Sequence, residues 1–274
     1  MKRITWWTAA IAAGALLLAL VGLRAHAQPR DAVKEIERYR EALAEGNPAE
    51  LWEARGEGLW NTKRGPRQVS LEGCDLGKGP GVVKGTYAVL PRYFADVDRV
   101  MDLETRLVHC AVTLQGFTAA EATRQLFGDG AKRSDIEALV AYVTAESKGV
   151  VMDVPMSHPR EREAYALGER IFFFRGGSHD FSCASCHGEP GKRIRLQDLP
   201  NLTDPKDAQR AYTSWPAYRV SQGELRTMQW RLFDCFRQQR FPSLEFGSEA
   251  SIALTMFLAT NANGGTFNAP AIKR

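Results

Sequence analysis

Two cysteines and a histidine stand together in Cys183-Ala-Ser-Cys186-His187. The spacing puts the two thiols about one helical turn apart and an imidazole directly after the second. This pattern is typical of c-type haem attachment, in which both thiols add to one porphyrin and the histidine ligates its iron. A redox dithiol would need a βαβ context and a zinc site a second cysteine pair, and the sequence indicates neither. We predict one c-type haem, held by Cys183 and Cys186 with His187 as proximal ligand.

The second axial position of such an iron has four candidates, which are Met228, Met256, His179 and Cys235. Methionine is the usual partner in small electron carriers. Met256 fits an apolar helix face, and His179 lies very close to the attachment loop. Cys235 follows Arg231 by four residues, so the guanidinium would lie beside the thiol on one helix and lower its proton affinity. A buried, inert thiol is the alternative for Cys235.

The first 27 residues have the pattern of an export signal. Lys2 and Arg3 precede an apolar run over residues 9–23, and Ala25-His-Ala27 follows. This order is typical of a secretory signal cleaved near Ala27. A membrane anchor is the alternative, although the run is shorter than the roughly 20 residues that a span needs. Export to an oxidising compartment would allow Cys74 and Cys110 to pair.

Composition indicates a globular protein, with 44% hydrophobic and 25% charged residues among 274. Cleavage after Ala27 would leave 33 Lys and Arg residues against 32 Asp and Glu. That balance gives no support to nucleic-acid binding, so we expect no nucleic-acid partner. Between Cys183 and Arg240, ten basic residues stand against six acidic ones, which fits either an anion site or a solvated surface.

Helical periodicity and capping patterns predict an all-α fold of two cytochrome c-like domains with irregular loops. Residues 61–92 look irregular, and residues 150–159 look like a linker. The predicted helices cover 31–46, 118–127, 134–147, 160–174, a segment that opens with Ser221-x-x-Glu224 and ends at Pro242, and 248–261. The predicted organisation is a signal peptide (1–27), an N-terminal cytochrome c-like domain lacking haem (28–152) and a C-terminal c-type haem domain (153–274).

Several long stretches resemble the SoxA family, the c-type cytochrome subunits of bacterial SoxAX complexes. They are SLEGCDLGKGPGVVKGTYAVLPRYFADVDRVMDLETRLVHC, FSCASCHG, RIRLQDLPNLT, WPAYRVSQGELRTMQWRLFDCFRQQR and APAIKR. The resemblance implies a periplasmic L-cysteine S-thiosulfotransferase. Such an enzyme joins thiosulfate oxidatively to a cysteine of the carrier SoxYZ and passes two electrons through haem. The implied partners are SoxX in a heterodimer, SoxYZ, thiosulfate and an electron-accepting cytochrome c.

The resemblance also implies roles for particular residues. Cys235 would be the distal iron ligand and the catalytic sulfur, in some members a persulfide, and Arg231 would hold the anionic substrate. Arg237 or Lys192 could add positive charge to the same cleft. Cys183, Cys186 and His187 match the haem-binding positions, and Cys74 and Cys110 match a disulfide of the family.

Other functions remain open at this point. The N-terminal part lacks a C-x-x-C-H motif, so the chain resembles the mono-haem form of the family. A simple periplasmic c-type electron carrier and a tetrathionate-forming thiosulfate dehydrogenase are the alternative functions. A haem subunit that only docks a catalytic partner is a third.

Overall fold

The computed structural model describes residues 34–35, 38–39, 41–42, 45–194 and 197–273 of the chain. The predicted signal peptide lies outside these residues, as does half of the helix expected over 31–46, of which residues 34–35, 38–39 and 41–42 are helical. The chain divides into two units, Met1–Ala42 and Leu43–Arg274. Within the described residues, no helix has both the length and the apolar character needed to cross a bilayer.

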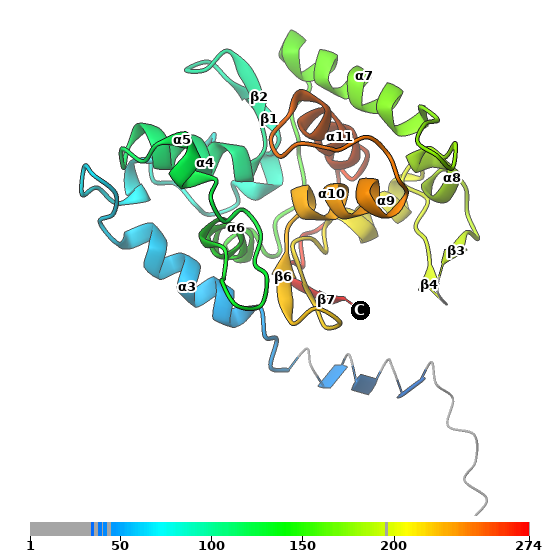
Figure 1. The fold of residues 1–274 in the computed structure, drawn as a ribbon, viewed down its shortest axis with the longest axis horizontal. Helices are drawn as coiled ribbons and strands as arrows, with labels where there is room; N and C mark the ends of the chain where they lie inside the picture. Colours follow the sequence, from blue (N-terminus) through cyan, green and yellow to red (C-terminus); the bar gives the residue numbers. More distant parts are fainter. Residues whose placement is uncertain (1–33, 36–37, 40, 43–44, 195–196, 274) are drawn as a thin grey trace, which may run out of the picture. The chain divides into compact units, whose positions relative to one another are not determined.

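The N-terminal part of the larger unit is built around two crossing helices, α3 and α6 (Figure 1). They cross at Gly56, where an added Cβ would stand 2.0 Å from the carbonyl oxygen of Ala138. Only glycine permits so close an approach. The elements of this part are α3 (Glu50–Asn61), η1 (Leu71–Gly73), η2 (Tyr87–Val89), α4 (Leu103–Thr113), α5 (Ala119–Ala122) and α6 (Asp135–Ala145).

The C-terminal part repeats this crossing with α7 and α11, which lie side by side in Figure 1. A Cβ on Gly168 would stand 2.0 Å from the carbonyl oxygen of Ala253. The predicted helices 160–174 and 248–261 are confirmed here, the second with Ser248 as its N-cap. The helices of this part are α7 (Pro159–Phe173), α8 (Cys183–His187), α9 (Pro205–Tyr212), α10 (Met228–Gln238) and α11 (Glu249–Asn261).

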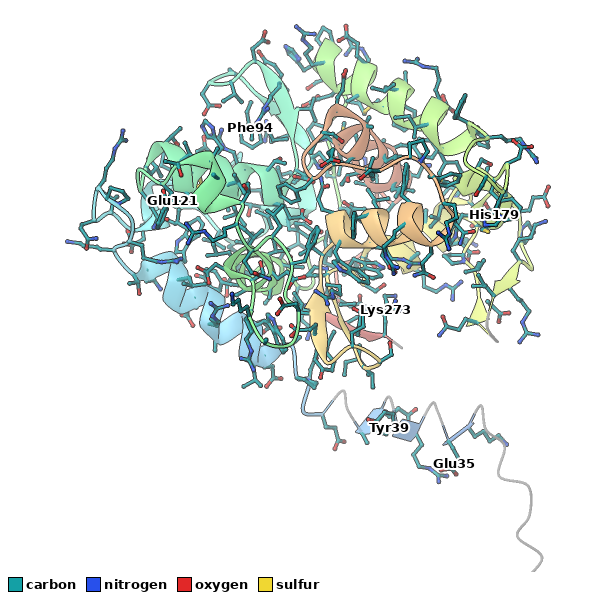
Figure 2. The ribbon with its side chains drawn as sticks, viewed as in Figure 1. Glu35, Tyr39, Phe94, Glu121, His179 and Lys273 are labelled. Carbon is teal, nitrogen blue, oxygen red and sulfur yellow. A yellow bond between two sulfur atoms is a disulfide. The ribbon has the colours of Figure 1, made fainter. Side chains whose placement is uncertain are left out.

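The structure also contains short strands, which were not predicted from the sequence. They form three small sheets. Two of these sheets are antiparallel pairs, β1 with β2 and β3 with β4, and the third is a mixed sheet of three strands in the order β6-β5-β7. In that sheet Arg219 lies opposite both Glu224 and Lys273. Phe94, labelled in Figure 2, ends the first strand. The strands are β1 (Arg92–Phe94), β2 (Arg99–Met101), β3 (Arg193–Ile194), β4 (Gln197–Asp198), β5 (Ala217–Arg219), β6 (Glu224–Arg226) and β7 (Ala271–Lys273).

A hairpin followed by a helix occurs twice, at a constant offset of 125 residues. The hairpin β1–β2 leads through the N-cap Asp102 into α4, and β5–β6 leads through the N-cap Thr227 into α10. The predicted capping box Ser221-x-x-Glu224 is therefore wrong. Glu224 starts a strand, because Gly223 turns the chain with φ 66° and the hairpin closes before the helix begins.

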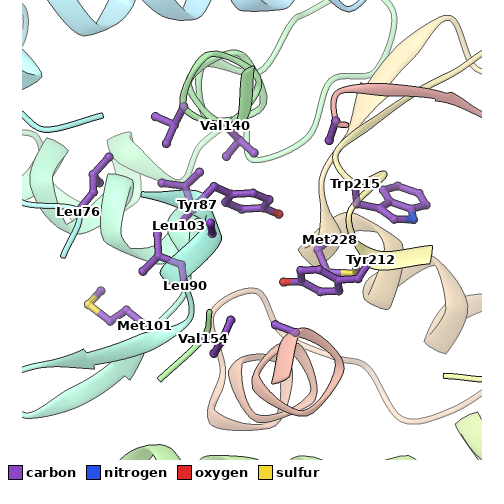
Figure 3. Close-up of a cluster of buried hydrophobic side chains, with 14 of the residues drawn as sticks. Leu76, Tyr87, Leu90, Met101, Leu103, Val140, Val154, Tyr212, Trp215 and Met228 are labelled. Atoms are coloured by element: carbon purple, nitrogen blue, oxygen red, sulfur yellow. The ribbon is translucent and has the colours of Figure 1, made fainter. Parts of the chain in front are cut away.

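The core between the two parts contains buried tyrosines and buried carboxyl groups. Tyr87 and Tyr212, again 125 residues apart, extend into one cluster of apolar side chains (Figure 3). Beside them the side chains of Asp102 and Glu104 accept hydrogen bonds from Gln229, at the first turn of α10. These contacts fix the start of the helix that carries Arg231 and Cys235.

Candidate haem and thiol site

The helix α8 carries the C-x-x-C-H motif and is fixed by a capping box at its start. The Ser182 hydroxyl accepts a hydrogen bond from the Ser185 backbone N–H, and the Ser185 hydroxyl oxygen accepts one from the Ser182 backbone N–H. This single turn places Cys183 and Cys186 on neighbouring positions, and both are free thiols. α8 packs beside α7, so this longer helix supports the attachment turn.

The ring of His187 is held in one orientation by the loop that follows. Its Nδ1 lies 3.0 Å from the carbonyl oxygen of Pro200. Since a carbonyl can only accept, Nδ1 carries the proton and donates it, which leaves Nε2 as a lone-pair donor for a metal. Leu202 N also donates to the His187 carbonyl, at 2.8 Å. An oriented imidazole of this tautomer is the arrangement that iron ligation requires.

The thiol of Cys235 lies close enough to Cys183 and Cys186 for the charges of these groups to shift one another's pKa. Burial, followed by the charge of Cys235, raises the pKa of Cys183 to about 12, and the charge of Cys186 is among the causes that raise the pKa of Cys235. The structure thus brings together the three free thiols that the sequence singled out, from α8 and α10. Two can attach a porphyrin and the third is a soft ligand for its iron, so the residues fit a c-type haem.

One expectation about Cys235 holds only in part. The positive charge of Arg231 does lower the proton affinity of this thiol, as expected. Burial is the largest influence and raises the pKa of Cys235, and the opposing pull of Arg231 does not overcome it. The uncharged thiol is therefore favoured by the protein alone, and bonding to a metal would be needed to hold it as a thiolate.

Arg231 is half-buried and only loosely held. Its Nη1 lies 3.7 Å from Oδ2 of Asp234, a longer separation than a hydrogen bond allows. Asp234 is itself buried and is bonded by Arg237 at 2.7 Å and by Gln238 at 2.6 Å. Its charge is thus largely satisfied elsewhere, which leaves the Arg231 guanidinium able to take another anion.

The remaining ligand candidates lie elsewhere. Met228 and Met256 are packed into the hydrophobic core, with exposed fractions of 5% and 0%. His179 lies in the loop between α7 and α8, beside Phe181 (Figure 2). Lys192 pairs with Glu189, and Arg237 lines a surface pocket of about 350 Å³ with Phe233 and Arg240.

The N-terminal part contains an arginine and a cysteine at the same spacing, but there the cysteine is in a disulfide and the arginine is hydrogen-bonded. Arg106 precedes Cys110 by four residues on α4, as Arg231 precedes Cys235 on α10. Cys110 is bonded to Cys74 in a disulfide, which confirms that expected pair. Arg106 is fully engaged, donating to the carbonyl of Asp75 and to the carboxylate of Asp96, each at 2.7 Å. Only the C-terminal copy keeps a free thiol beside an available guanidinium.

Comparison with known proteins agrees with this site. A protein of Hydrogenophilus thermoluteolus named L-cysteine S-thiosulfotransferase subunit SoxA is 52% identical, over 88% of each chain. The chain belongs to the SoxA family. A SoxA protein of Hydrogenobacter thermophilus is 34% identical, over 94% of this chain and 97% of its own.

Two further comparisons concern the cytochrome character of this SoxA-family chain. Residues 55–152 match the family model described as SoxA/TsdA, cytochrome c domain. A crystal structure of SoxXA from P. pantotrophus has the same fold, with a TM-score of 0.70, 24% identity, and coverage of 86% of this chain and 84% of that one. A c-type haem is the cofactor of this SoxA-family chain.

Two features of the site escaped sequence reasoning. Pro200, which orients His187, was not singled out, because a backbone carbonyl gives no signal in residue type. Arg219 on β5 was also missed, although its charge lowers the pKa of Cys235. Comparing the two hairpin–helix segments would have marked it, since its counterpart 125 residues earlier is the uncharged Phe94.

Proposed function

We propose that this chain is the SoxA subunit of a periplasmic L-cysteine S-thiosulfotransferase. It pairs with SoxX, joins thiosulfate to a cysteine of the carrier SoxYZ, and delivers two electrons to an accepting cytochrome c. The single observation that carries this reaction is the free Cys235 thiol, next to an available arginine and near the C-x-x-C-H thiols. Membership of the SoxA family supports the same reaction.

In the proposed site, Cys183 and Cys186 would hold the haem covalently, and His187, through Nε2, and Cys235, on α10, would ligate its iron. The hydrogen bond from His187 Nδ1 to Pro200 supports this assignment, because it leaves the correct nitrogen free. The haem, when bound, would supply the electron acceptor for oxidation of the sulfur.

Cys235 and Arg231 carry the proposed transfer. Arg231 binds the sulfonate oxygens, since a planar guanidinium matches an oxyanion group. The Cys235 thiol bonds to the outer sulfur of thiosulfate, with loss of one proton and two electrons, to give Cys235–S–S–SO₃⁻. The carrier thiolate then attacks the middle sulfur, forms the carrier S-thiosulfonate and releases Cys235 as a thiolate. Atoms and charge balance in both steps.

The two-part organisation is proposed as two cytochrome c-like domains, residues 28–152 without haem and 153–274 with one, after a signal peptide of residues 1–27. The paired crossings at Gly56 and Gly168 support this interpretation. So does the hairpin–helix segment that recurs at a constant offset. In this interpretation the helices form the two domains, as an all-α class requires, and the short strands are connections between them.

A reconstituted assay tests the function. Haem-loaded protein with its SoxX partner is incubated with thiosulfate, carrier and an oxidised cytochrome c, and the products are separated. We expect carrier S-thiosulfonate and two reduced cytochromes per modification. Tetrathionate formed at the same rate without carrier would instead identify a thiosulfate dehydrogenase.

A further inference from the structure

Arg219 is a partly buried arginine whose Nε has no hydrogen-bond partner among the residues that the structure describes. It ends β5 in the middle of the sheet β6-β5-β7. Its Nε is enclosed and forms no hydrogen bond to any residue that the structure describes. A buried donor that is left unpaired destabilises the folded protein, because it has lost its hydrogen bond to water and gained none. Such a position is more readily explained by a group that arrives from outside than by a structural role.

The opposite strand does not satisfy this guanidinium. Glu224 lies directly across from Arg219 in the register of β5 and β6. Its Oε1 instead accepts a hydrogen bond from the backbone N–H of Gly130, at 3.1 Å. Within the described part of the chain, Glu224 and Arg219 form no ion pair.

The N-terminal part has an uncharged residue at the position that corresponds to Arg219. Phe94 corresponds to Arg219 at the same offset by which Arg106 corresponds to Arg231. The Phe94 ring lies 4.1 Å from the guanidinium carbon of Arg106, in a cation–π contact. The C-terminal part thus places a second positive charge where the N-terminal part places an aromatic ring.

Electrostatics agree with this placement of Arg219. Burial lowers its pKa first, and the positive charge of Arg231 lowers it further, whereas Asp234 and Cys235 raise it. Arg219 and Arg231 therefore lie close enough to repel one another, and the charge of Cys235 also acts on Arg219. Asp234 already bonds Arg237 and Gln238. Two like charges held together beside a thiol favour an anion between them.

We propose that Arg219 is a second substrate-binding residue, which with Arg231 holds the sulfonate group of thiosulfate against Cys235. The proposal rests on the function proposed above. The two arginines bind the sulfonate from two elements, β5 and α10, so the outer sulfur of thiosulfate remains directed at the thiol. A dianion bound by both guanidinium groups would also satisfy the unpaired Nε of Arg219.

The test compares three variants of the haem-loaded complex. Arg219→Gln removes the charge, Arg219→Lys keeps it without the planar fork, and Arg219→Phe copies the ring–guanidinium pair of the N-terminal part. Arg210→Gln is the matched control, because Arg210 is an exposed arginine that pairs with Asp207 on α9. We measure KM for thiosulfate, kcat with saturating thiosulfate, inhibition by sulfate and the haem absorption spectrum.

We expect Arg219→Gln and Arg219→Phe to raise both KM for thiosulfate and the inhibition constant of sulfate by about 10-fold or more, because each variant loses one charge-assisted hydrogen bond to the anion. Arg219→Lys should recover part of this loss, and the haem spectrum should not change. Wild-type KM and sulfate inhibition in both uncharged variants would overturn the proposal while leaving the transfer function intact. Absence of thiosulfate transfer in the wild-type protein would instead overturn the proposed function.

Discussion

Glu104 and Gln229 join the first turns of two helices that are far apart in the sequence. Oε1 of Glu104 accepts the backbone N–H of Gln229 at 3.1 Å, and the Gln229 side chain donates to Asp102 at 2.6 Å. Glu104 thus caps α10 from α4, since it satisfies a donor that the helix itself cannot. The C-terminal part therefore depends on the N-terminal part for the position of the helix that carries Cys235.

This buried cluster makes stability depend on pH. Burial, followed by the charge of Asp102, raises the pKa of Glu104 to about 8. An acid whose pKa is raised by folding stabilises the protein below its unfolded pKa, near 4.5, and loses that contribution as pH rises toward 8. The melting temperature should therefore fall between pH 5 and pH 8.

Glu104→Gln removes this proton and should flatten the decline, as measured by circular dichroism melts across the pH range. Glu163→Gln, at an exposed position, is the control and should leave the decline unchanged. Tyr87, Tyr212 and Asp102 also face Glu104. The tyrosine pKa values are raised well above 10, so neither tyrosine titrates in this range. An equally steep decline in Glu104→Gln would exclude Glu104 as its source.

The helix crossing at Gly56 predicts a sharp difference between two neighbouring glycines. Gly56→Ala would force a methyl group against the Ala138 carbonyl, whereas a Cβ at Gly58 meets nothing within 4 Å. We expect Gly56→Ala to lower the free energy of unfolding by about 3 kcal/mol, from overpacking. Gly58→Ala should raise it by roughly 0.5–1 kcal/mol, through helix propensity. Urea titration measures both, and equal effects would contradict the crossing.

Removal of the Cys74–Cys110 disulfide should affect folding and leave the haem site unchanged. The bond spans 36 residues in a part of the chain without a C-x-x-C-H motif. Replacing both cysteines by alanine should cost about 2–5 kcal/mol of unfolding free energy. The haem absorption spectrum should remain that of the wild type. A changed spectrum would show that the two sites are coupled.

Arg231→Ala should impair turnover without disturbing the iron. The guanidinium has only a distant partner in Asp234, so its loss leaves little unsatisfied inside the protein. We expect kcat/KM for thiosulfate to fall by about 10-fold or more, as for loss of one charge-assisted contact. The haem spectrum and melting temperature serve as controls. Unchanged kinetics would remove Arg231 from the substrate site.

Sequence reasoning located the chemistry better than the fold. The C-x-x-C-H motif, Cys235 and helices α7 and α11 could all be predicted, because they depend on residue type, spacing and caps. α3 was missed, since Gly56 and Gly58 weaken its helical pattern and the crossing that requires Gly56 is a tertiary contact. Strands of three residues are too short for a period of two to be visible.

The burial of Cys235, and therefore the direction of its net pKa shift, could not be predicted from the sequence. Spacing correctly placed Arg231 beside the thiol, but the sign of the net pKa shift depends on how much solvent the fold excludes. Arg219 was missed for a similar reason. A strand residue and a helix residue come together there only through the hairpin β5–β6.

The most direct measurement is mass spectrometry of the carrier cysteine after reaction with the wild-type protein and with Cys235→Met. Methionine keeps a sulfur that can ligate iron but cannot form a disulfide bond to thiosulfate. We expect carrier S-thiosulfonate with the wild-type protein, and an unmodified carrier with Cys235→Met, although that variant still holds its haem. Modification of the carrier at the wild-type rate by Cys235→Met would contradict it.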